Sequence, residues 1–255
     1  MPFMNLRVGR QKRTPLEASA PEPGATAIAA NESGGDRRTR ILREAATLFA
    51  EYGYEGTSVR QIGERSGILP GSLYYYFPSK EELVRTIIHD PMWIVTRCHE
   101  RIYQSSLDAE QKLVLSVLLR FREMGRCWES HAIVFRDGSV LQKIKGFEFI
   151  EEAKSRSYKT QKAIFDEGIA TGLFDPEMDT YLSVGTIARL LSSTIEWMLK
   201  GEIVSAEQPA RYTLDTIIDH HLKWVLRMVR TAERLDEPCP REFCERWLAA
   251  ELPAV

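Results

Sequence analysis

The chain is poor in cysteine, carries almost no excess charge and has no long apolar run. Four cysteines among 255 residues are too few for a dense disulfide framework, and their spacing is not that of zinc ligands. A formal net charge of −2 excludes a strongly basic protein that binds any polyanion. No apolar run approaches the roughly 20 residues that span a bilayer, and no apolar block marks a signal peptide. We therefore expect a cytoplasmic protein with free thiols and no membrane partner.

The sequence also lacks the residue constellations of an enzyme. It contains no glycine-rich phosphate loop, no nucleophile elbow and no His-x-x-x-His metal motif. His220 and His221 are adjacent, so on a helix they face different directions. Met124 and Cys127 near His131 do not have the spacing of a metal site. We predict no catalytic residue, no bound metal and no cofactor.

The most informative segment is 57–83, TSVRQIGERSGILPGSLYYYFPSKEEL, in which signals for helix starts and stops follow one another closely. Ser58 begins a capping-box pattern that predicts a helix start, and Gly67 supplies the left-handed residue that ends this helix. Pro70 suits the first turn of a second, very short helix. Ser79 begins a second capping-box pattern, which predicts a long third helix.

This order of elements is that of a helix-turn-helix, whose second helix places its N-terminal residues in the major groove of DNA. Hydroxyl groups and cations around the motif suit phosphate contacts, whereas the bare start of the second helix and Tyr75 are placed for base edges. The predicted DNA-binding residues are Arg38, Arg40, Thr57, Ser58, Arg60, Leu69, Pro70, Gly71, Ser72, Tyr74, Tyr75, Tyr76 and Lys80. The alternative interpretation is a corner of a helical bundle whose tyrosines pack into a core.

Over residues 36–90 the chain closely resembles the TetR family of one-component transcriptional repressors. The resemblance rests on Thr57, Gly67, Gly71, Leu73-Tyr74, Phe77 and Ser79-Lys80-Glu81-Glu82-Leu83, and extends upstream to Tyr52-Gly53-Tyr54-Glu55-Gly56. Two residues depart from the family pattern: Leu69 stands where many members carry a capping Ser or Thr, and Tyr76 stands where His is common. The first departure weakens the helix cap, and the second keeps a hydrogen-bonding ring tip.

Composition and periodicity divide the chain into four parts. Residues 1–35 lack periodicity and predict a disordered arm. Residues 36–96 form the predicted DNA-binding domain, 97–236 a larger helical ligand-binding and dimerisation domain, and 237–255 a C-terminal tail with a short helix. Because nearly every segment from residue 80 onward has helical character, we predict an all-α fold. The predicted helices are 80–104, which Pro91 is expected to kink, 108–130, 132–143, 147–171, 178–200, 206–236 and 241–250.

Two of these helices, 178–200 and 206–236, are apolar nearly all round. Such helices are buried, and two of them per chain predict a four-helix homodimer interface about a two-fold axis. The alternative is that one subunit buries both helices by itself. The predicted interface residues are Leu191, Ile195, Ile217, His221, Trp224 and Met228.

Polar groups within apolar stretches of the second domain are candidates for binding a small-molecule effector. They are Arg120, Trp128, Arg136, Tyr158, Arg189 and Glu196. Arg189 is flanked by apolar residues, so if it is buried it requires a partner. That partner is either a ligand carboxylate or phosphate, or Glu196 in a structural ion pair.

Residues 147–176 resemble the branch of the TetR family that controls lipid, steroid or acyl-CoA breakdown. This resemblance implies an acyl-CoA thioester or a hydrophobic acid as the effector, with a multidrug-sensing repressor as the alternative. The family resemblance further implies a homodimer on a palindromic operator in double-stranded DNA, with the helix at 80–104 coupling the effector to the spacing of the DNA-binding heads. A structural helical dimer without DNA contact is the remaining alternative, and it does not account for the capped tyrosine helix.

Overall fold

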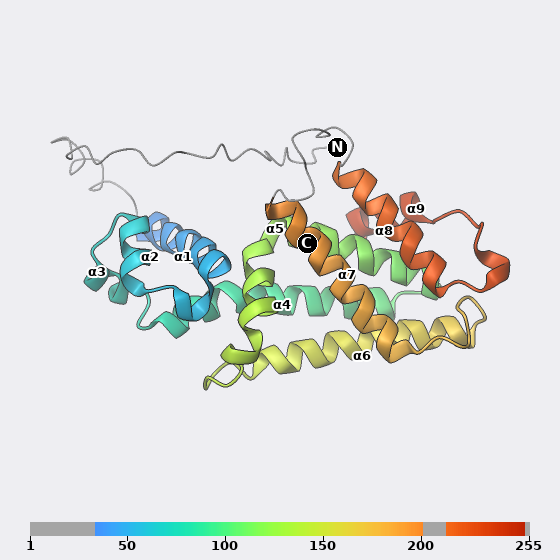
Figure 1. The fold of residues 1–255 in the computed structure, drawn as a ribbon, viewed down its shortest axis with the longest axis horizontal. Helices are drawn as coiled ribbons and strands as arrows, with labels where there is room; N and C mark the ends of the chain where they lie inside the picture. Colours follow the sequence, from blue (N-terminus) through green and yellow to red (C-terminus); the bar gives the residue numbers. More distant parts are fainter. Residues whose placement is uncertain (1–33, 201–212, 253–255) are drawn as a thin grey trace.

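The computed structural model describes residues 34–200 and 213–252, which form an elongated helical molecule (Figure 1). The all-α prediction is confirmed, and within the described residues the sole strand-like pairing is an isolated bridge between Phe174 and Arg230. The predicted arm at 1–35 lies almost wholly outside the described residues. The helices are α1 (Gly34–Gly56), α2 (Val59–Ser66), α3 (Pro70–Tyr76), α4 (Lys80–Gln104), α5 (Ala109–Leu141), α6 (Phe149–Ala170), α7 (Thr180–Lys200), α8 (Leu214–Val229), the short 3-10 helix η2 (Ala232–Arg234) and α9 (Arg241–Glu251).

Helix α1 and the two short helices α2 and α3 gather at one end of the molecule, and α8 and α9 lie toward the other end (Figure 1). The long helix α4 begins beside α3 and leads into the larger unit, where it packs against α5 and α6. It continues through Pro91 as one helix from Lys80 to Gln104. One helix therefore connects the small N-terminal unit with the interior of the larger one.

Helix α5 agrees in part with the sequence prediction. Separate helices over 108–130 and 132–143 were expected, and α5 consists of two helical segments that meet at a kink. The kink lies at Cys127, which leaves helical geometry (φ −131°, ψ 38°), and not at residue 131. Gly138, where a further interruption was expected, stays in the helix, and a Cβ at this position would lie 3.0 Å from Nζ of Lys154 in α6.

Two other boundaries also differ. The helix expected over 206–236 ends at Val229, because Arg230 leaves the helix (φ −70°, ψ 147°) and pairs with Phe174; residues 206–212 lie outside the described residues. At the start of α4, Ser79 accepts a hydrogen bond from the Glu82 backbone N–H at 3.2 Å, as predicted. The Glu82 side chain pairs with Arg85 at 3.5 Å, so the cap lacks the reciprocal half of the predicted capping box.

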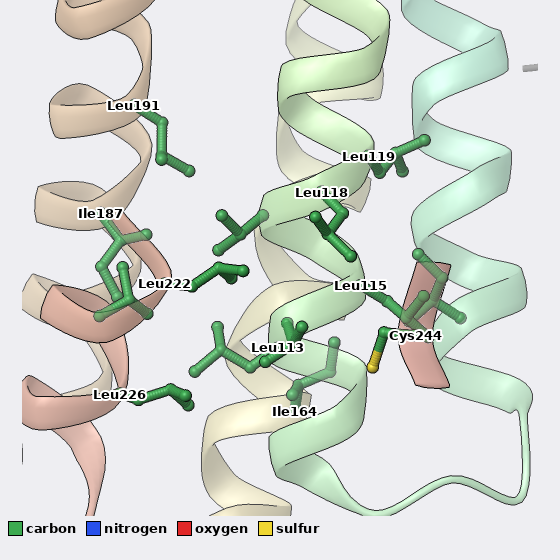
Figure 2. Close-up of a cluster of buried hydrophobic side chains, with 14 of the residues drawn as sticks. Leu113, Leu115, Leu118, Leu119, Ile164, Ile187, Leu191, Leu222, Leu226 and Cys244 are labelled. Atoms are coloured by element: carbon green, nitrogen blue, oxygen red, sulfur yellow. The ribbon is translucent and has the colours of Figure 1, made fainter. Parts of the chain in front are cut away.

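The molecule has two apolar cores. The larger core lies between α4, α5, α6, α7, α8 and α9, and Figure 2 shows leucine and isoleucine side chains from α5 to α8 filling this space. The smaller core lies under α1 to α3 and the start of α4. It also contains Ile133 and Leu141 of α5 and Ile150 of α6, all fully buried. The two units are thus joined by shared packing as well as by α4.

Arg136 of α5 strengthens this junction. Its guanidinium donates hydrogen bonds to the carbonyl oxygens of Phe49 and, at 3.0 Å, of Ala50, near the end of α1. The neighbouring Asp137 accepts a hydrogen bond from the Tyr54 backbone N–H at 2.9 Å. Arg136 therefore holds the N-terminal unit and does not face an effector cavity, which corrects its assignment as a ligand-binding residue.

In the parts of the chain that the structure describes, no helix is both long enough and apolar enough to cross a membrane. The same parts contain no group of three His, Cys, Asp or Glu side chains arranged to hold a metal ion.

Candidate nucleic-acid interface and effector cavity

The predicted capping signals of the helix-turn-helix are confirmed. The Ser58 hydroxyl accepts a hydrogen bond from the Gln61 backbone N–H at 3.2 Å, and the Gln61 side chain accepts one from the Ser58 N–H at 2.8 Å, which completes the capping box. Gly67 adopts the left-handed conformation (φ 66°, ψ 32°) that ends α2. Leu69 gives α3 no side-chain cap, in agreement with the weak cap expected there, and Pro70 occupies the first turn.

Close packing between α2 and α3 sets the angle of the short helix. A Cβ on Gly63 of α2 would lie 3.1 Å from the Ile68 carbonyl oxygen and 3.3 Å from Cα of Pro70, so a larger residue would force the helices apart. Leu73 and Phe77 are both buried in the core beneath α3. As predicted, they share the inner face, which leaves Ser72, Tyr74 and Tyr75 exposed, whereas Tyr76 is half-buried against the core.

The outer surface around α3 exposes several large side chains to solvent. Tyr75 is 88% exposed and Leu69 is 76% exposed, and Tyr74 is also exposed. Beside them lies a cleft of about 490 Å³, lined by Arg37, Arg40, Gly67, Ile68, Leu69, Ser72, Tyr75 and Tyr76. Two arginines from α1 thus stand on the same surface as the start of α3, where a phosphate backbone and base edges can be contacted together.

One predicted phosphate contact is corrected by the structure. Thr57 is buried, and its hydroxyl donates to the carbonyl oxygens of Gly53 at 2.8 Å and Leu48 at 3.1 Å. This hydroxyl fastens the exit of α1, where Gly53 departs from helical geometry at φ 85°. Thr57 therefore has a structural role, because its side chain does not reach the surface.

Several other predicted DNA contacts are accessible but also make contacts within the protein. Arg60 forms an exposed ion pair with Glu64 at 2.8 Å, and the guanidinium of Arg38 lies 4.8 Å from the centre of the Phe77 ring. The ammonium of Lys80 lies 4.3 Å from the centre of the Tyr54 ring, and partial burial lowers its pKa. These contacts limit the conformations of the three side chains, which lie near the surface that carries α3.

Comparison with known proteins agrees with this geometry. The sequence pattern described as "Bacterial regulatory proteins, tetR family" matches residues 41–87, which span most of α1, all of α2 and α3 and the start of α4. The HTH-type transcriptional repressor KstR2 of Mycolicibacterium smegmatis is 30% identical to this chain over 183 residues, covering 71% of this chain and 89% of that protein. This chain belongs to the TetR family. It is therefore a DNA-binding transcriptional regulator.

Solved structures extend the similarity to the whole fold. The structure of the ketosteroid transcriptional regulator KstR2 of Mycobacterium tuberculosis aligns with a TM-score of 0.68 and 25% sequence identity, covering 79% of this chain and 98% of that chain. AmtR of Mycobacterium smegmatis aligns with a TM-score of 0.62 over 88% of this chain at 19% identity, which shows the common TetR-family fold alone. The similarity thus includes the larger helical unit in addition to the DNA-binding helices.

The larger unit of this TetR-family protein contains a small cavity between α4, α5, α6 and α7. Its volume is about 20 Å³, which is room for one water-sized group. The walls are mainly aliphatic and aromatic side chains, such as Val117, Ile164 and Ile187. Among the described residues that line it, Arg120 of α5 is the one that carries a charge, and burial lowers the pKa of its guanidinium.

Two histidines lie close to Arg120. Burial, with a further contribution from the Arg120 charge, lowers the pKa of His99 to about 3 and that of His131 also to about 3. Both imidazoles are therefore neutral at pH 7. His99 lines the cavity together with Gln161, and the Gln161 side chain donates to the Ser157 hydroxyl at 3.0 Å. The cavity thus combines one cation with neutral hydrogen-bonding groups.

The structure separates the predicted ligand-binding residues. Arg120 lines the cavity, whereas Trp128 and Tyr158 do not. The Tyr158 ring packs edge-on against the Tyr181 ring, with centroids 5.4 Å apart. Arg189 is exposed and stacks on Phe135, at 4.8 Å from the ring centre, so it does not line the cavity and needs neither a ligand nor Glu196 as a partner, which corrects its assignment as a ligand-binding residue. The side chain of Glu196 lies outside the described residues.

The predicted dimer residues are also divided by the structure. Leu191, Ile217 and His221 are buried within one subunit, and His221 Nε2 lies 2.9 Å from the Thr194 hydroxyl. Their assignment to the dimer interface is therefore corrected. Trp224 and Met228 of α8 are exposed, as is Trp197 of α7. The side chain of Ile195 lies outside the described residues.

The sequence analysis did not identify His99 or Gln161 as candidates for binding an effector. Only the packing of α4 and α6 against α5 brings these residues to the cavity. Their spacing in the sequence contains no signal that could have identified them.

Proposed function

We propose that this protein is a ligand-responsive repressor that binds a palindromic DNA operator as a homodimer. Each subunit inserts the start of α3 into the major groove, and occupation of the operator blocks transcription. Binding of a small effector in the larger unit favours a different spacing of the two DNA-binding heads. A roughly 100-fold difference in effector affinity between the two conformations supplies about 2.7 kcal/mol for this change.

The observation that carries the proposal is the exposed surface of α3. A tyrosine that is 88% exposed, beside a glycine, a serine and an exposed leucine, buries little surface within the subunit and is accessible to a partner. The residues Arg37 and Arg40 adjoin the same cleft and suit contacts with phosphates. The relatives described as HTH-type transcriptional repressors support the same function.

The proposed effector is a hydrophobic acid, a steroid-derived acid or an acyl-CoA thioester. Support comes from the apolar walls of the cavity and from the relative described as a ketosteroid transcriptional regulator. A multidrug-sensing repressor is the second candidate, favoured by the mainly apolar walls of the cavity, which by themselves do not select one ligand class. A panel of acids, thioesters and hydrophobic cations, screened for release of DNA, separates these two functions.

A gel-shift assay tests DNA binding directly. The purified protein is incubated at fixed salt, with nonspecific competitor, against fragments from its own promoter and the adjacent intergenic regions. We expect a discrete complex on one palindromic fragment. If no fragment gives a competitor-resistant complex, a selection for bound DNA extends the search to the rest of the genome. Absence of such a complex in both experiments would contradict the proposal.

Substitutions on either side of α3 are expected to affect DNA binding differently. Tyr75→Ala removes a proposed base contact, so it reduces discrimination between operator and random DNA by about 1–3 kcal/mol. Lys80→Ala removes a proposed phosphate contact, so it weakens binding to every sequence. It also reduces the slope of the logarithm of the binding constant against the logarithm of the salt concentration by about one. Fluorescence anisotropy at several salt concentrations measures both quantities.

The control is Tyr103→Ala, which replaces an exposed tyrosine of α4 outside the proposed DNA interface. Equal loss of discrimination from Tyr75→Ala and Lys80→Ala would contradict these assigned roles.

The proposed dimer uses the exposed apolar side chains of α7 and α8. Trp224 is 51% exposed, and Met228 stands one turn further along the same face of α8. A buried charge in a two-fold interface meets its own symmetry copy. We therefore expect Trp224→Arg to convert the dimer to a monomer in light-scattering measurements, whereas Leu235→Arg, at an exposed leucine after η2, leaves the dimer intact. A wild-type protein that is monomeric at micromolar concentration would exclude the dimer.

A further inference from the structure

Arg120, which is half-buried as a residue, differs from the fully buried cations Arg230 and Lys112. Arg230 is held by both carboxylate oxygens of Glu110 at 2.7 and 3.0 Å, and Lys112 is held by both oxygens of Glu167 at 2.9 Å. Among the described residues, no carboxylate lies close enough to Arg120 to influence its pKa, and burial is the sole cause of its shift. A buried cation without a counter-charge is costly. Within the described part of the fold, Arg120 thus lies at the wall of a cavity without a carboxylate to balance its charge.

The groups around Arg120 supply hydrogen bonds without supplying charge. His99 and His131 are neutral, and the buried Nε2 atom of His131 has no hydrogen-bond partner in the described structure. Gln161 lines the same cavity from α6. A neutral imidazole donates through one nitrogen and accepts through the other, so it can serve an anion beside a guanidinium without repelling Arg120. The arrangement matches an anion that carries a single charge.

We infer that the cavity binds the carboxylate of an apolar monocarboxylic acid, with Arg120 as its counter-ion. The planar guanidinium donates two parallel hydrogen bonds, a geometry that matches a carboxylate. One cation balances one carboxylate but leaves the several charges of a coenzyme A moiety uncompensated. The apolar side chains of Leu113, Ile164 and Leu191 face the rest of the ligand. This inference rests on the proposed effector-responsive function and names the chemical class of the effector.

The size of the cavity adds a consequence for regulation. A volume of about 20 Å³ has room for one water-sized group, so the cavity must widen to admit the carboxylate and the apolar tail. The ligand therefore enters by displacing side chains between α6 and α7, where Ile164, Ile187 and Leu191 line the cavity. His99 on the opposite wall belongs to α4, the helix that begins at Ser79 directly after α3. Ligand entry thus acts on the helix that carries the DNA-binding unit.

The test is calorimetric titration of the full-length protein with sodium decanoate in the absence of DNA. We expect one site per subunit. Arg120→Met keeps the bulk of the side chain without its charge and weakens binding roughly 10- to 100-fold, the effect of losing charge-assisted hydrogen bonds. Arg120→Lys, which keeps the charge but loses the planar fork, gives an intermediate affinity. Arg97→Met, at an exposed arginine of α4, binds decanoate as the wild type does. The uncharged 1-decanol binds wild type and Arg120→Met equally weakly.

Thermal unfolding without ligand provides a second readout. Arg120→Met removes an uncompensated buried charge, so its Tm is expected to rise, whereas an arginine with a structural partner would give a lower Tm when replaced. Saturating decanoate raises the Tm of the wild type but not of Arg120→Met. Wild-type affinity for decanoate in Arg120→Met, equal affinity of the wild type for decanoate and 1-decanol, or binding of decanoyl-CoA without binding of decanoate would each overturn the inference.

The calorimetric titration and the gel-shift assay test the inferred ligand class and the proposed function separately. A protein that shifts its operator but binds no decanoate remains a repressor, and the inferred ligand class is wrong. A protein that binds decanoate through Arg120 but shifts no DNA retains the inferred site, and the proposed function is wrong.

Discussion

Arg230→Met is expected to lower the free energy of unfolding by about 3–5 kcal/mol, because it leaves the carboxylate of Glu110 buried without its principal partner. The two side chains are 3% and 7% exposed and form a bidentate ion pair. Arg230 also donates to the carbonyl oxygens of Glu237 and Pro238, which fastens the segment that leads into α9. Arg234 lies 3.4 Å from Glu110 and compensates only part of the loss.

Urea denaturation of wild type and variants measures this effect. The control is Lys162→Met, which breaks a solvent-exposed pair with Asp166 on α6 and is expected to cost about 0.5 kcal/mol or less. The double variant Glu110→Met/Arg230→Met should recover most of the stability, because it removes both buried charges together. A loss for Arg230→Met no greater than that for Lys162→Met would show that the buried pair does not stabilise the fold.

Gly168→Ala is expected to destabilise the larger unit by about 3 kcal/mol or more, because the buried Phe174 ring cannot move aside for the added methyl group. A Cβ at residue 168 would lie 2.0 Å from Cδ2 and 2.4 Å from Cε2 of Phe174. The Phe174 ring is fully buried against Phe165, and the Phe174 backbone N–H donates to the Gly168 carbonyl oxygen at 3.0 Å. The ring therefore cannot withdraw without breaking the turn after α6.

Thermal and urea unfolding compare this variant with Gly125→Ala, in which the added Cβ of an exposed α5 residue meets no atom within 4 Å. Gly125→Ala should be neutral or stabilise by up to about 1 kcal/mol, as expected for alanine in a helix. Phe174→Leu removes part of the obstructing ring, so Gly168→Ala should cost less in that background. Equal costs in both backgrounds would place the clash elsewhere.

These two sites lie at the same end of the molecule. The backbone bridge between Phe174 and Arg230, together with the hydrogen bond from the Asp175 N–H to the Val229 carbonyl oxygen at 2.8 Å, joins the turn after α6 to the end of α8. The proposed dimer face is formed by α7 and α8, which begin or end at this junction. Loss of either site should therefore weaken dimerisation as well as folding.

The helix-turn-helix could be predicted from sequence almost residue by residue, because its signals are local. The cap at Ser58, the left-handed Gly67 and the first-turn Pro70 act on backbone groups within a few residues of themselves. The same locality explains the error at Thr57. A hydroxyl at the start of a helix suits a phosphate contact by residue type, but the bend at Gly53 brings the Leu48 and Gly53 carbonyls to it instead.

By itself, the sequence determined the helical fold class, the order of the DNA-binding helices and the residues exposed on α3, since these follow from helix period and capping. Only the tertiary structure decided which polar side chains of the larger unit are buried. Arg120 and Arg189 both stand within apolar stretches, yet one lines a cavity and the other stacks on Phe135 in solvent. Helix period places residues on a face, but the bend of α5 and the packing of α4, α6 and α7 determine what that face meets.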